Sequence, residues 1–478
     1  MSLKEIIVGL IALLTLLLVL FNNSGYRRKL AWMVIIIFLP IAGSLLFLLF
    51  GLNLRSVKMY MQKHKPLIDK LQELDPAGLS PDGPDESLVN ETYRPLVRLL
   101  SQDINNLSAG NSFEVIIDGR VKQEMLMEDI RNAKEYIHIE YFHFGMDKGS
   151  RVIKRLLEKK AEEGVKVRFL NENIANLPNP LSYYRSMEKS GVDVENFTSY
   201  KMHLIEFITS LNHRNHRKIV VIDGKVGYTG GMNINDNYFR RWRDTHMRLS
   251  GAAVGALNAL FLDSWLTSGG TIDKPLLYYL QTDTSSRDIS SPYYFKDKVV
   301  QVVPDDPYAL SPVIQHGYEW IFHNIRKYIY IQTPYFAPPE AMLSAMKAAA
   351  ERGVEVVLML PQRADNLLMV HTNRAYYEEC LAAGIRIFLR KGEFIHSKTF
   401  VCDDYLSQIG TANLDMRSLD LSYEVNTYIY DTEVALACKE IFFKDLAQCE
   451  ELDLQKWKKR PFPLRIIESV FKLFTPLL

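Results

Sequence analysis

One motif occurs twice in the chain, and the two copies constrain the fold more than any other feature of the sequence. Each copy reads His-x-Lys-x4-Asp, continues with Gly at His+14 and Asn at His+17, and has an acid at His+28. Agreement at every one of these positions excludes coincidence and indicates an internal duplication. The first copy consists of His216, Lys218, Asp223, Gly230, Asn233 and Asp244, and the second of His396, Lys398, Asp403, Gly410, Asn413 and Glu424.

The segments around the motifs repeat the same order of strands and helices. β-Branched runs alternate with helical patterns that end at glycines, as expected for the start of a strand and the end of a helix. Strands that alternate with helices predict an α/β sheet in each half. The expected segments are residues 113–117, 136–144, 149–163, 165–170 and 192–197 in the first half, and 299–303, 328–336, 340–352, 354–360 and 385–389 in the second.

The period of a strand places the histidine and the lysine of each motif on one face, because residues i and i+2 point the same way. Lysine is a compact cation that suits phosphate oxygens. Imidazole is a nucleophile, or an acid or base near neutral pH. The sequence has no cluster of acids and histidines suited to Mg²⁺ or Zn²⁺, so we expect no metal and no cofactor. This set predicts phosphodiester chemistry through a covalent phosphohistidine, with cations and amides stabilising the transition state.

The acidic residues of the repeat have two different expected roles. Asp223 and Asp403 belong to the candidate catalytic set and either hydrogen-bond the imidazoles or anchor the following turn. Strand parity favours anchoring, because position +7 lies on the face opposite the histidine. Asp244 and Glu424, which arrive from another strand, are the better candidates to orient the imidazoles.

Small and amide residues complete the predicted site. Gly231, directly after Gly230, and Gly410 would let the next turn approach a bound anion closely. Asn233 and Asn413 would supply neutral hydrogen-bond donors to the same anion.

The N-terminus predicts a membrane hairpin. No charge occurs in residues 6–26 or 30–54, and only the short basic loop at residues 27–29 separates these stretches. The second stretch is long enough to span a bilayer, and the first is at the short end of that range. A cleaved signal peptide is the alternative for the first stretch. The distribution of Lys and Arg favours a multi-pass protein of the cell membrane with its body in the cytoplasm.

The net charge of +1 hides basic ends and an acidic body, which argues against a nucleic-acid-binding protein. The tail predicts a basic amphipathic helix on an anionic membrane surface, with a helix packed on the body as the alternative. Its apolar face would carry Ile466, Ile467, Val470, Phe471 and Phe474, and its polar face Arg465, Glu468, Ser469 and Lys472.

Five segments follow from these patterns. They are a transmembrane hairpin (1–55), a juxtamembrane segment and linker (56–106), two lobes (107–290 and 291–455) and the tail (456–478). The first half also has an insertion before its motif, which would be either a buried helix or an apolar wall for acyl chains. Its apolar residues include Tyr200, Met202, Leu204, Ile205, Phe207 and Ile208.

The paired motifs resemble those of the phospholipase D superfamily, and the whole chain resembles the bacterial cardiolipin synthases within it. Residues 212–218, 333–336 and 474–478 carry this closer resemblance together with the two-span N-terminus. It implies two pseudo-symmetric α/β lobes that share one active site. His216 would be the nucleophile, and His396 would act first as acid and then as base.

The implied reaction is phosphatidyl transfer between two phosphatidylglycerol molecules, which gives cardiolipin and glycerol. The expected partners are phosphatidylglycerol and other anionic lipids, and no nucleic acid. Alternatives are a membrane phospholipase D, a phosphatidyltransferase to another alcohol, a nuclease of the same superfamily and, least favoured, a non-enzymatic scaffold.

Overall fold

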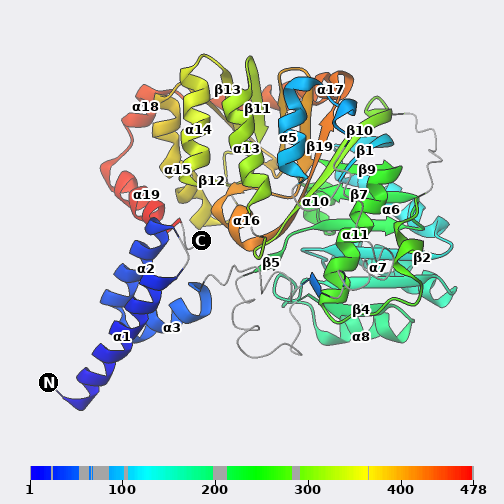
Figure 1. The fold of residues 1–478 in the computed structure, drawn as a ribbon, viewed down its shortest axis with the longest axis horizontal. Coiled ribbons are helices and arrows are strands. Elements are labelled where there is room, and N and C mark those ends of the chain that lie inside the picture. The colour runs from blue at the N-terminus through cyan, green and yellow to red at the C-terminus, as the bar shows by residue number, and fades with distance from the viewer. Residues whose placement is uncertain are drawn as a thin grey trace.

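Two α/β lobes form the body of the protein (Figure 1). The computed structural model describes residues 2–22, 25–52, 64–65, 67, 85–101, 106–197, 213–282, 291–309, 311–363 and 365–475. The first lobe comprises β1 (Leu107–Ile116), α6 (Gly119–Asn132), β2 (Tyr136–Tyr141), α7 (Lys148–Glu162), β3 (Lys166–Asn171), α8 (Leu181–Lys189), β4 (Asp193–Asn196), β5 (Arg214–Asn215), β6 (Lys218–Ile222), β7 (Val226–Gly230), α10 (Asp236–Arg240), β8 (Trp242–Arg243), β9 (His246–Ser250), α11 (Ala252–Thr267) and α12 (Leu276–Leu280).

The second lobe repeats this order of elements. It comprises β10 (Tyr294–Asp305), α13 (Val313–Asn324), β11 (Tyr328–Gln332), β12 (Phe336–Ala337), α14 (Glu340–Glu351), β13 (Glu355–Pro361), α15 (Leu367–Ala382), β14 (Arg386–Arg390), β15 (Phe394–Ile395), β16 (Thr399–Cys402), β17 (Leu406–Gly410), β18 (Leu414–Asp415), α16 (Met416–Leu421), β19 (Ser422–Tyr430), α17 (Thr432–Leu446) and β20 (Cys449–Glu451).

One mixed sheet runs through both lobes. β1 and β10 pair antiparallel at its centre, and the strand order read outward from them is the same on each side. In the first lobe the order is β1-β9-β7-β6-β2-β3-β4, and in the second it is β10-β19-β17-β16-β11-β13-β14, where β20 adds an edge strand without a counterpart in the first lobe. The lobes are therefore related by a pseudo-two-fold axis at the β1–β10 pair, and the predicted α/β fold is confirmed.

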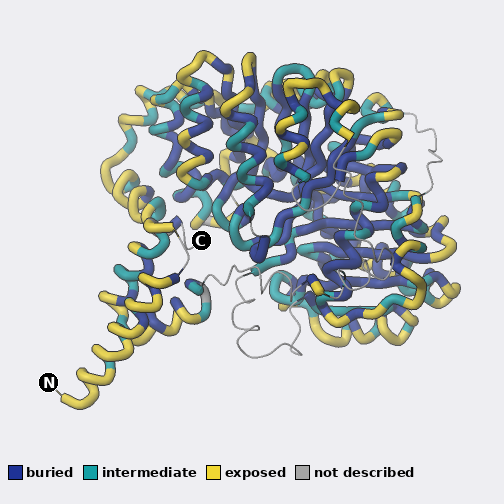
Figure 2. Tube along the Cα trace, in the orientation of Figure 1, coloured by how far each residue is buried: buried dark blue, intermediate teal, exposed yellow. Residues whose placement is uncertain are grey.

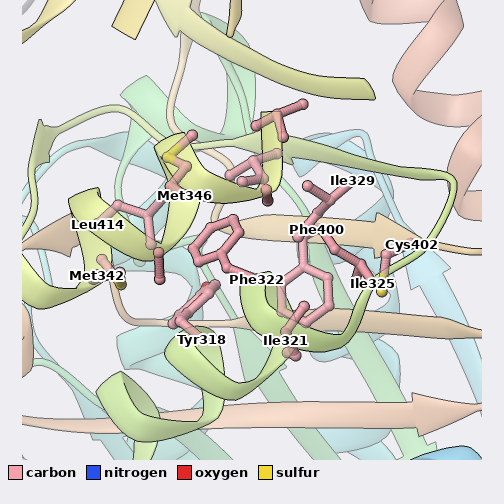
Figure 3. Close-up of a cluster of buried hydrophobic side chains, with 14 of the residues drawn as sticks. Tyr318, Ile321, Phe322, Ile325, Ile329, Met342, Met346, Phe400, Cys402 and Leu414 are labelled. Carbon is pink, nitrogen blue, oxygen red and sulfur yellow. The ribbon is translucent and has the colours of Figure 1, made fainter. Parts of the chain in front are cut away.

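Apolar side chains fill the layers on both faces of the sheet. In the first lobe α6, α7 and α8 cover one face, and in the second lobe α13, α14 and α15 do so. Figure 3 shows part of this second core, where Phe322 of α13 and Met346 of α14 belong to one cluster with Phe400 of the sheet. On the other face, α11 and α17 contribute to a single cluster that includes strand residues of both lobes. The two lobes therefore share one of their hydrophobic cores.

The N-terminal helices differ from the predicted hairpin. α1 (Leu3–Phe21) is exposed along most of its length and is long and apolar enough to span a membrane (Figure 2). The second apolar stretch is divided into α2 (Tyr26–Phe38) and α3 (Pro40–Phe50), because the chain breaks at Leu39. A β-carbon on Gly43 would lie 2.8 Å from the carbonyl oxygen of Ile35, so the two pieces fold back against each other. Among the described residues only α1 is a candidate span, and the prediction of two spans is not supported.

The C-terminal tail packs on the body, which was one of the two predicted alternatives, and its contact with a membrane surface stays a prediction. It forms α18 (Leu454–Lys458) and α19 (Phe462–Phe474), and α19 lies between α15 and the N-terminal helices (Figure 1). The side that packs on α15 is mixed, because Lys472 forms an ion pair with Glu379 and the ring of Phe471 stacks on that of His371. Phe471 therefore does not lie on the free apolar face, as predicted, whereas Arg465 and Ser469 are exposed. The apolar residues that α19 leaves exposed are Phe462, Ile466, Ile467, Val470 and Leu473.

Part of the predicted linker belongs to the second lobe. η1 (Glu86–Leu88), η2 (Glu91–Tyr93) and α5 (Arg94–Leu100) pack beside α13. The turn-rich linker at residues 75–84 and the apolar insertion at residues 200–208 lie outside the described residues.

Candidate active site

His216 lies between two short strands of the first lobe, β5 and β6. β5 pairs in parallel with the start of β19 in the second lobe, and the backbone N–H of His216 donates a 2.9 Å hydrogen bond to the carbonyl oxygen of Tyr423. This pairing brings the imidazole to Glu424, and Nδ1 lies 3.0 Å from each oxygen of its carboxylate. The carboxylate that orients His216 therefore comes from the other lobe.

His396 repeats this arrangement in the opposite direction. β15, which precedes it, pairs with β8 of the first lobe, and the N–H of His396 donates a 2.8 Å hydrogen bond to the carbonyl oxygen of Arg243. Nδ1 of His396 then lies 2.7 Å from Oδ2 of Asp244. Each orienting acid thus serves the histidine of the other copy, and neither lobe contains a complete site.

Both imidazoles are held in the neutral form near pH 7. Burial lowers the pKa of His216 to about 4 and that of His396 to about 3, against the opposing attraction of the paired carboxylates. A carboxylate at Nδ1 favours the tautomer with its proton on Nδ1 and a lone pair on Nε2. Both Nε2 atoms are therefore suited to attack phosphorus or to exchange a proton.

The two motif lysines lie at the same boundary between the lobes. Nζ of Lys218 donates to the carbonyl oxygen of His216 over 2.7 Å, and Nζ of Lys398 lies 2.7 Å from Nδ1 of His396. Burial lowers the pKa of Lys398 to about 8 and that of Lys218 well below its usual range. In their charged forms the two lysines are suited to the oxygens of a phosphoryl group.

The two motif asparagines have different surroundings. Nδ2 of Asn233 donates to the hydroxyl of Tyr238 over 2.8 Å, and its Oδ1 accepts from the N–H of His143. The Tyr238 hydroxyl lies 3.5 Å from Nε2 of His396, so Asn233 acts through this tyrosine. Asn413 instead lines the cavity described below, and its Oδ1 has no hydrogen-bond partner among the residues that the structure describes. Only Asn413 has the position predicted for a direct contact with a bound anion.

The glycines of the motifs make room for neighbouring side chains. A β-carbon on Gly231 would lie 2.1 Å from Oδ1 of Asp244, and one on Gly410 would lie 1.9 Å from Oδ1 of Asn426. The space beside these glycines is taken by the side chains of Asp244 and of Asn426 in β19, and the predicted approach to a bound anion stays a prediction. The absence of a side chain at Gly231 thus leaves room for Asp244, the carboxylate that orients His396.

The motif aspartates are anchors of turns, which corrects their place in the catalytic set. Both occupy the left-handed region, with φ of 52° at Asp223 and 50° at Asp403. Each carboxylate accepts three backbone hydrogen bonds from the segment that leads into a neighbouring strand of the sheet. This strand is β2 for Asp223 and β11 for Asp403. The donors are Lys134, Glu135 and Tyr136 for Asp223, and Arg326, Lys327 and Tyr328 for Asp403.

A cavity of about 410 Å³ opens beside His216. Its wall is mixed, with apolar side chains from α15 and polar groups from β5, α16 and the start of β19. The lining residues are Phe142, Arg214, His216, Tyr335, Ala337, Asn366, Leu368, Met369, Thr372, Asn413, Asp415, Met416, Arg417, Ser418, Ser422 and Thr475. Thr475 directly follows α19, so the cavity lies at the end of the C-terminal helix.

Three basic residues of the site escaped the motif-based prediction. Lys122 of α6 is completely buried, its Nζ donates to the carbonyl oxygens of Met232 and Asn233 at 3.1 and 3.4 Å, and burial lowers its pKa to about 7. Arg214 and Arg417 line the cavity. Alignment of the two copies could have singled out both arginines, because the copies differ at these positions. Arg214 matches Phe394 of the second copy, and Arg417 matches Asn237 of the first.

A duplicated α/β sheet with crossed histidine–carboxylate pairs and two buried lysines defines an enzyme of the phospholipase D type. Residues 126–265 and 321–446 match the family described as "Cardiolipin synthase, PLD-like domain", and residues 7–51 match "Phospholipase_D-nuclease N-terminal". The chain belongs to the cardiolipin synthase family.

Curated relatives match over nearly the whole chain. Cardiolipin synthase 2 of Bacillus anthracis is 33% identical over 96% of this chain and 88% of its own length. The major cardiolipin synthase ClsA of Bacillus subtilis is 32% identical over 100% of both chains. Among solved structures, phosphatidylserine synthase of Haemophilus influenzae is similar in fold, with a TM-score of 0.60 and 16% identity over 82% of this chain and 100% of that one.

Proposed function

We propose that the chain transfers a phosphatidyl group from one phosphatidylglycerol molecule to a second, and releases cardiolipin and glycerol. The observation that carries this proposal is the pair of crossed histidine–carboxylate contacts beside two buried lysines, with His216 on the wall of the cavity. Membership of the cardiolipin synthase family supports the choice of lipid and acceptor.

In the first step Nε2 of His216 attacks the phosphorus of the donor lipid. The bond from phosphorus to the headgroup glycerol breaks, and His396 gives its proton to the departing oxygen. His396 is neutral near pH 7 before substrate binds, but a bound phosphodiester anion raises the pKa of a nearby imidazole and favours its protonated form. Lys218 and Lys398 neutralise the charge on the phosphoryl oxygens.

In the second step the phosphatidyl group leaves His216 for the second lipid. Neutral His396 removes the proton from the terminal glycerol hydroxyl of that lipid, and the oxygen attacks phosphorus as the bond to Nε2 of His216 breaks. His396 ends protonated and His216 neutral, so the enzyme is ready for another donor. Each step runs in reverse through the same groups.

A donor with a p-nitrophenol leaving group tests the two histidine roles, because nitrophenolate departs without a proton. His396→Asn should then give a burst of nitrophenolate and retain labelled lipid on the protein. His216→Ala should give neither. The exposed His323, changed to Asn, is the matched control. Label retained on His216→Ala would contradict the nucleophile assignment.

Phosphatidylglycerol as the sole lipid separates the alternative activities. Cardiolipin as the product supports transfer between two lipids, whereas phosphatidic acid alone would indicate a phospholipase D. Added serine or ethanolamine tests other acceptor alcohols in the same assay.

The anchoring helix suggests which side of the membrane carries the body. We propose that α1 spans the membrane once and that the body lies in the cytoplasm. Arg27, Arg28 and Lys29 follow α1 on the side of the body, whereas Lys4 at its other end is offset by Glu5. The positive-inside rule then places the body in the cytoplasm.

A further inference from the structure

The two sides of the active site differ although the lobes are pseudo-symmetric. Arg214 precedes His216 by two residues, as Phe394 precedes His396, and Ser422 precedes Glu424 as Trp242 precedes Asp244. These residues are direct partners in equivalent strand pairs, Arg214 with Ser422 and Phe394 with Trp242.

Aromatic rings fill the side that surrounds His396. The ring centroids of Trp242 and Phe394 are 4.9 Å apart, and that of Trp242 is 5.5 Å from that of His396. On the opposite side the matching pair is an arginine and a serine, and both line the cavity. Ser422 stands where the other copy has the large ring of Trp242, and the cavity opens beside His216 on this side.

A second arginine enters the same cavity from the other lobe. Arg417 follows Asn413 by four residues, where the first copy has Asn237 after Asn233. The positive charge of Arg417 acts on Arg214, and both guanidinium groups interact with the carboxylate of Glu172. The carboxylate of Asp415, which also lines the cavity, attracts Arg417 more strongly than Glu172 does. Burial lowers the pKa of both arginines and raises those of Glu172 and Asp415, so all four groups are costly to keep charged, and a bound anion would favour the charged arginines.

A guanidinium group binds phosphate oxygens in a bidentate manner, and two such groups form a strong anion site. Arg214 and His216 are two residues apart on an extended chain, a separation of about 6.6 Å. One glycerol bridges the two phosphates of cardiolipin, and this three-carbon link spans a comparable distance. In the proposed mechanism Lys218 and Lys398 bind the transferred phosphate, so the two arginines are available for a second phosphate.

We propose that Arg214 and Arg417 bind the phosphodiester of the second lipid, the one that is not bonded to His216. This proposal rests on the proposed function, because only an acceptor that carries its own phosphate would use the site. The same contacts would hold the second phosphate of cardiolipin in the reverse reaction.

Two water-soluble acceptors test this site in the full-length protein. Labelled phosphatidylglycerol in mixed micelles is the donor, glycerophosphoglycerol is the acceptor with a phosphodiester, and glycerol is the acceptor without one. The wild-type protein should prefer glycerophosphoglycerol. Arg214→Gln and Arg417→Gln should each reduce this preference at least tenfold, and Arg417→Lys should retain part of it. Arg120→Gln, at an exposed arginine, is the control and should keep the preference.

The outcomes separate the two proposals. An unchanged preference in both glutamine variants that still transfer to glycerol would overturn the arginine site alone. Absence of any transfer by the wild-type protein would overturn the proposed function. Inorganic phosphate is the probe for a free-phosphate site. If inorganic phosphate abolishes the preference for glycerophosphoglycerol at a concentration below the one at which glycerophosphoglycerol saturates the enzyme, the site binds free phosphate and the lipid assignment is wrong. If the preference persists at that concentration, the lipid assignment is supported.

Discussion

The charge of Lys398 sets an upper pH limit on the reaction. Burial lowers its pKa to about 8, while the nearby carboxylates of Asp244 and Glu424 oppose this shift. The lysine is charged below this pKa and neutral above it, so binding of the phosphodiester should weaken as pH rises through about 8. We expect kcat/KM for phosphatidylglycerol to fall there. Lys398→Arg, which stays charged, should weaken the decline even if its rate is lower, and a decline that remains would belong to Lys218, whose pKa burial also lowers. A flat profile to pH 9 in the wild-type protein would contradict this role.

The anchoring role of the motif aspartates gives a second prediction. Asp403→Ala removes the acceptor of three backbone N–H groups and should cost about 1–3 kcal/mol of folding free energy. The kcat of the folded fraction should change little, because the carboxylate contacts neither imidazole. Thermal unfolding in detergent and active-site titration measure the two quantities. Asp403→Asn, which tolerates the left-handed backbone, should be milder. Loss of kcat without loss of stability would refute the anchoring role.

Local geometry made several residue positions predictable. The strand period placed each histidine beside its lysine and each motif aspartate on the opposite face. The crossing of the carboxylates was not predictable, because it depends on the pairing of β5 with β19 and of β8 with β15. Lys122 is likewise invisible in sequence, since a single lysine in an amphipathic helix gives no sign of burial.

At the scale of elements, α19 predicts how the protein meets the bilayer. A fluorophore attached at Val470→Cys should be quenched by brominated acyl chains, because this residue lies on the exposed apolar side of the helix. Substitution of an exposed residue should change stability by no more than about 0.5 kcal/mol. The measurement uses the full chain in lipid nanodiscs, with Cys438 and Cys449 replaced by Ser. Ser469→Cys, one residue away, is the control, and equal quenching at both sites would place the helix elsewhere.

The N-terminal helices show where sequence patterns were insufficient. The strands and helices of the lobes were predictable, because terminal glycines and β-branched runs mark their ends. The break at Leu39 was not, since proline and glycine are both tolerated within a spanning helix. The fold-back depends on the close approach of Gly43 to Ile35, which is a contact between helices and not a property of composition.

The crossing of the two lobes gives a prediction for the whole molecule. With the p-nitrophenyl donor, Glu424→Gln should reduce the nitrophenolate burst, because it removes the partner of His216. Asp244→Asn should keep the burst and slow the transfer to the acceptor, because it affects His396. Losses of roughly 10²–10⁴-fold are expected from comparable orienting carboxylates. The opposite pattern would mean that each acid serves the histidine of its own lobe.

The shared sheet and the crossed carboxylates also bear on how such a chain could arise. A single repeat would hold one histidine and the carboxylate for another, so it would need a second copy paired through its β1 edge, as in an isologous dimer. Fusion of two genes would make that partnership permanent. After fusion the two copies could differ in sequence, because a substitution would then alter only one of the two halves of the active site. The aromatic pair at one contact between the copies and the arginine–serine pair at the other are the kind of divergence that a symmetric dimer could not acquire.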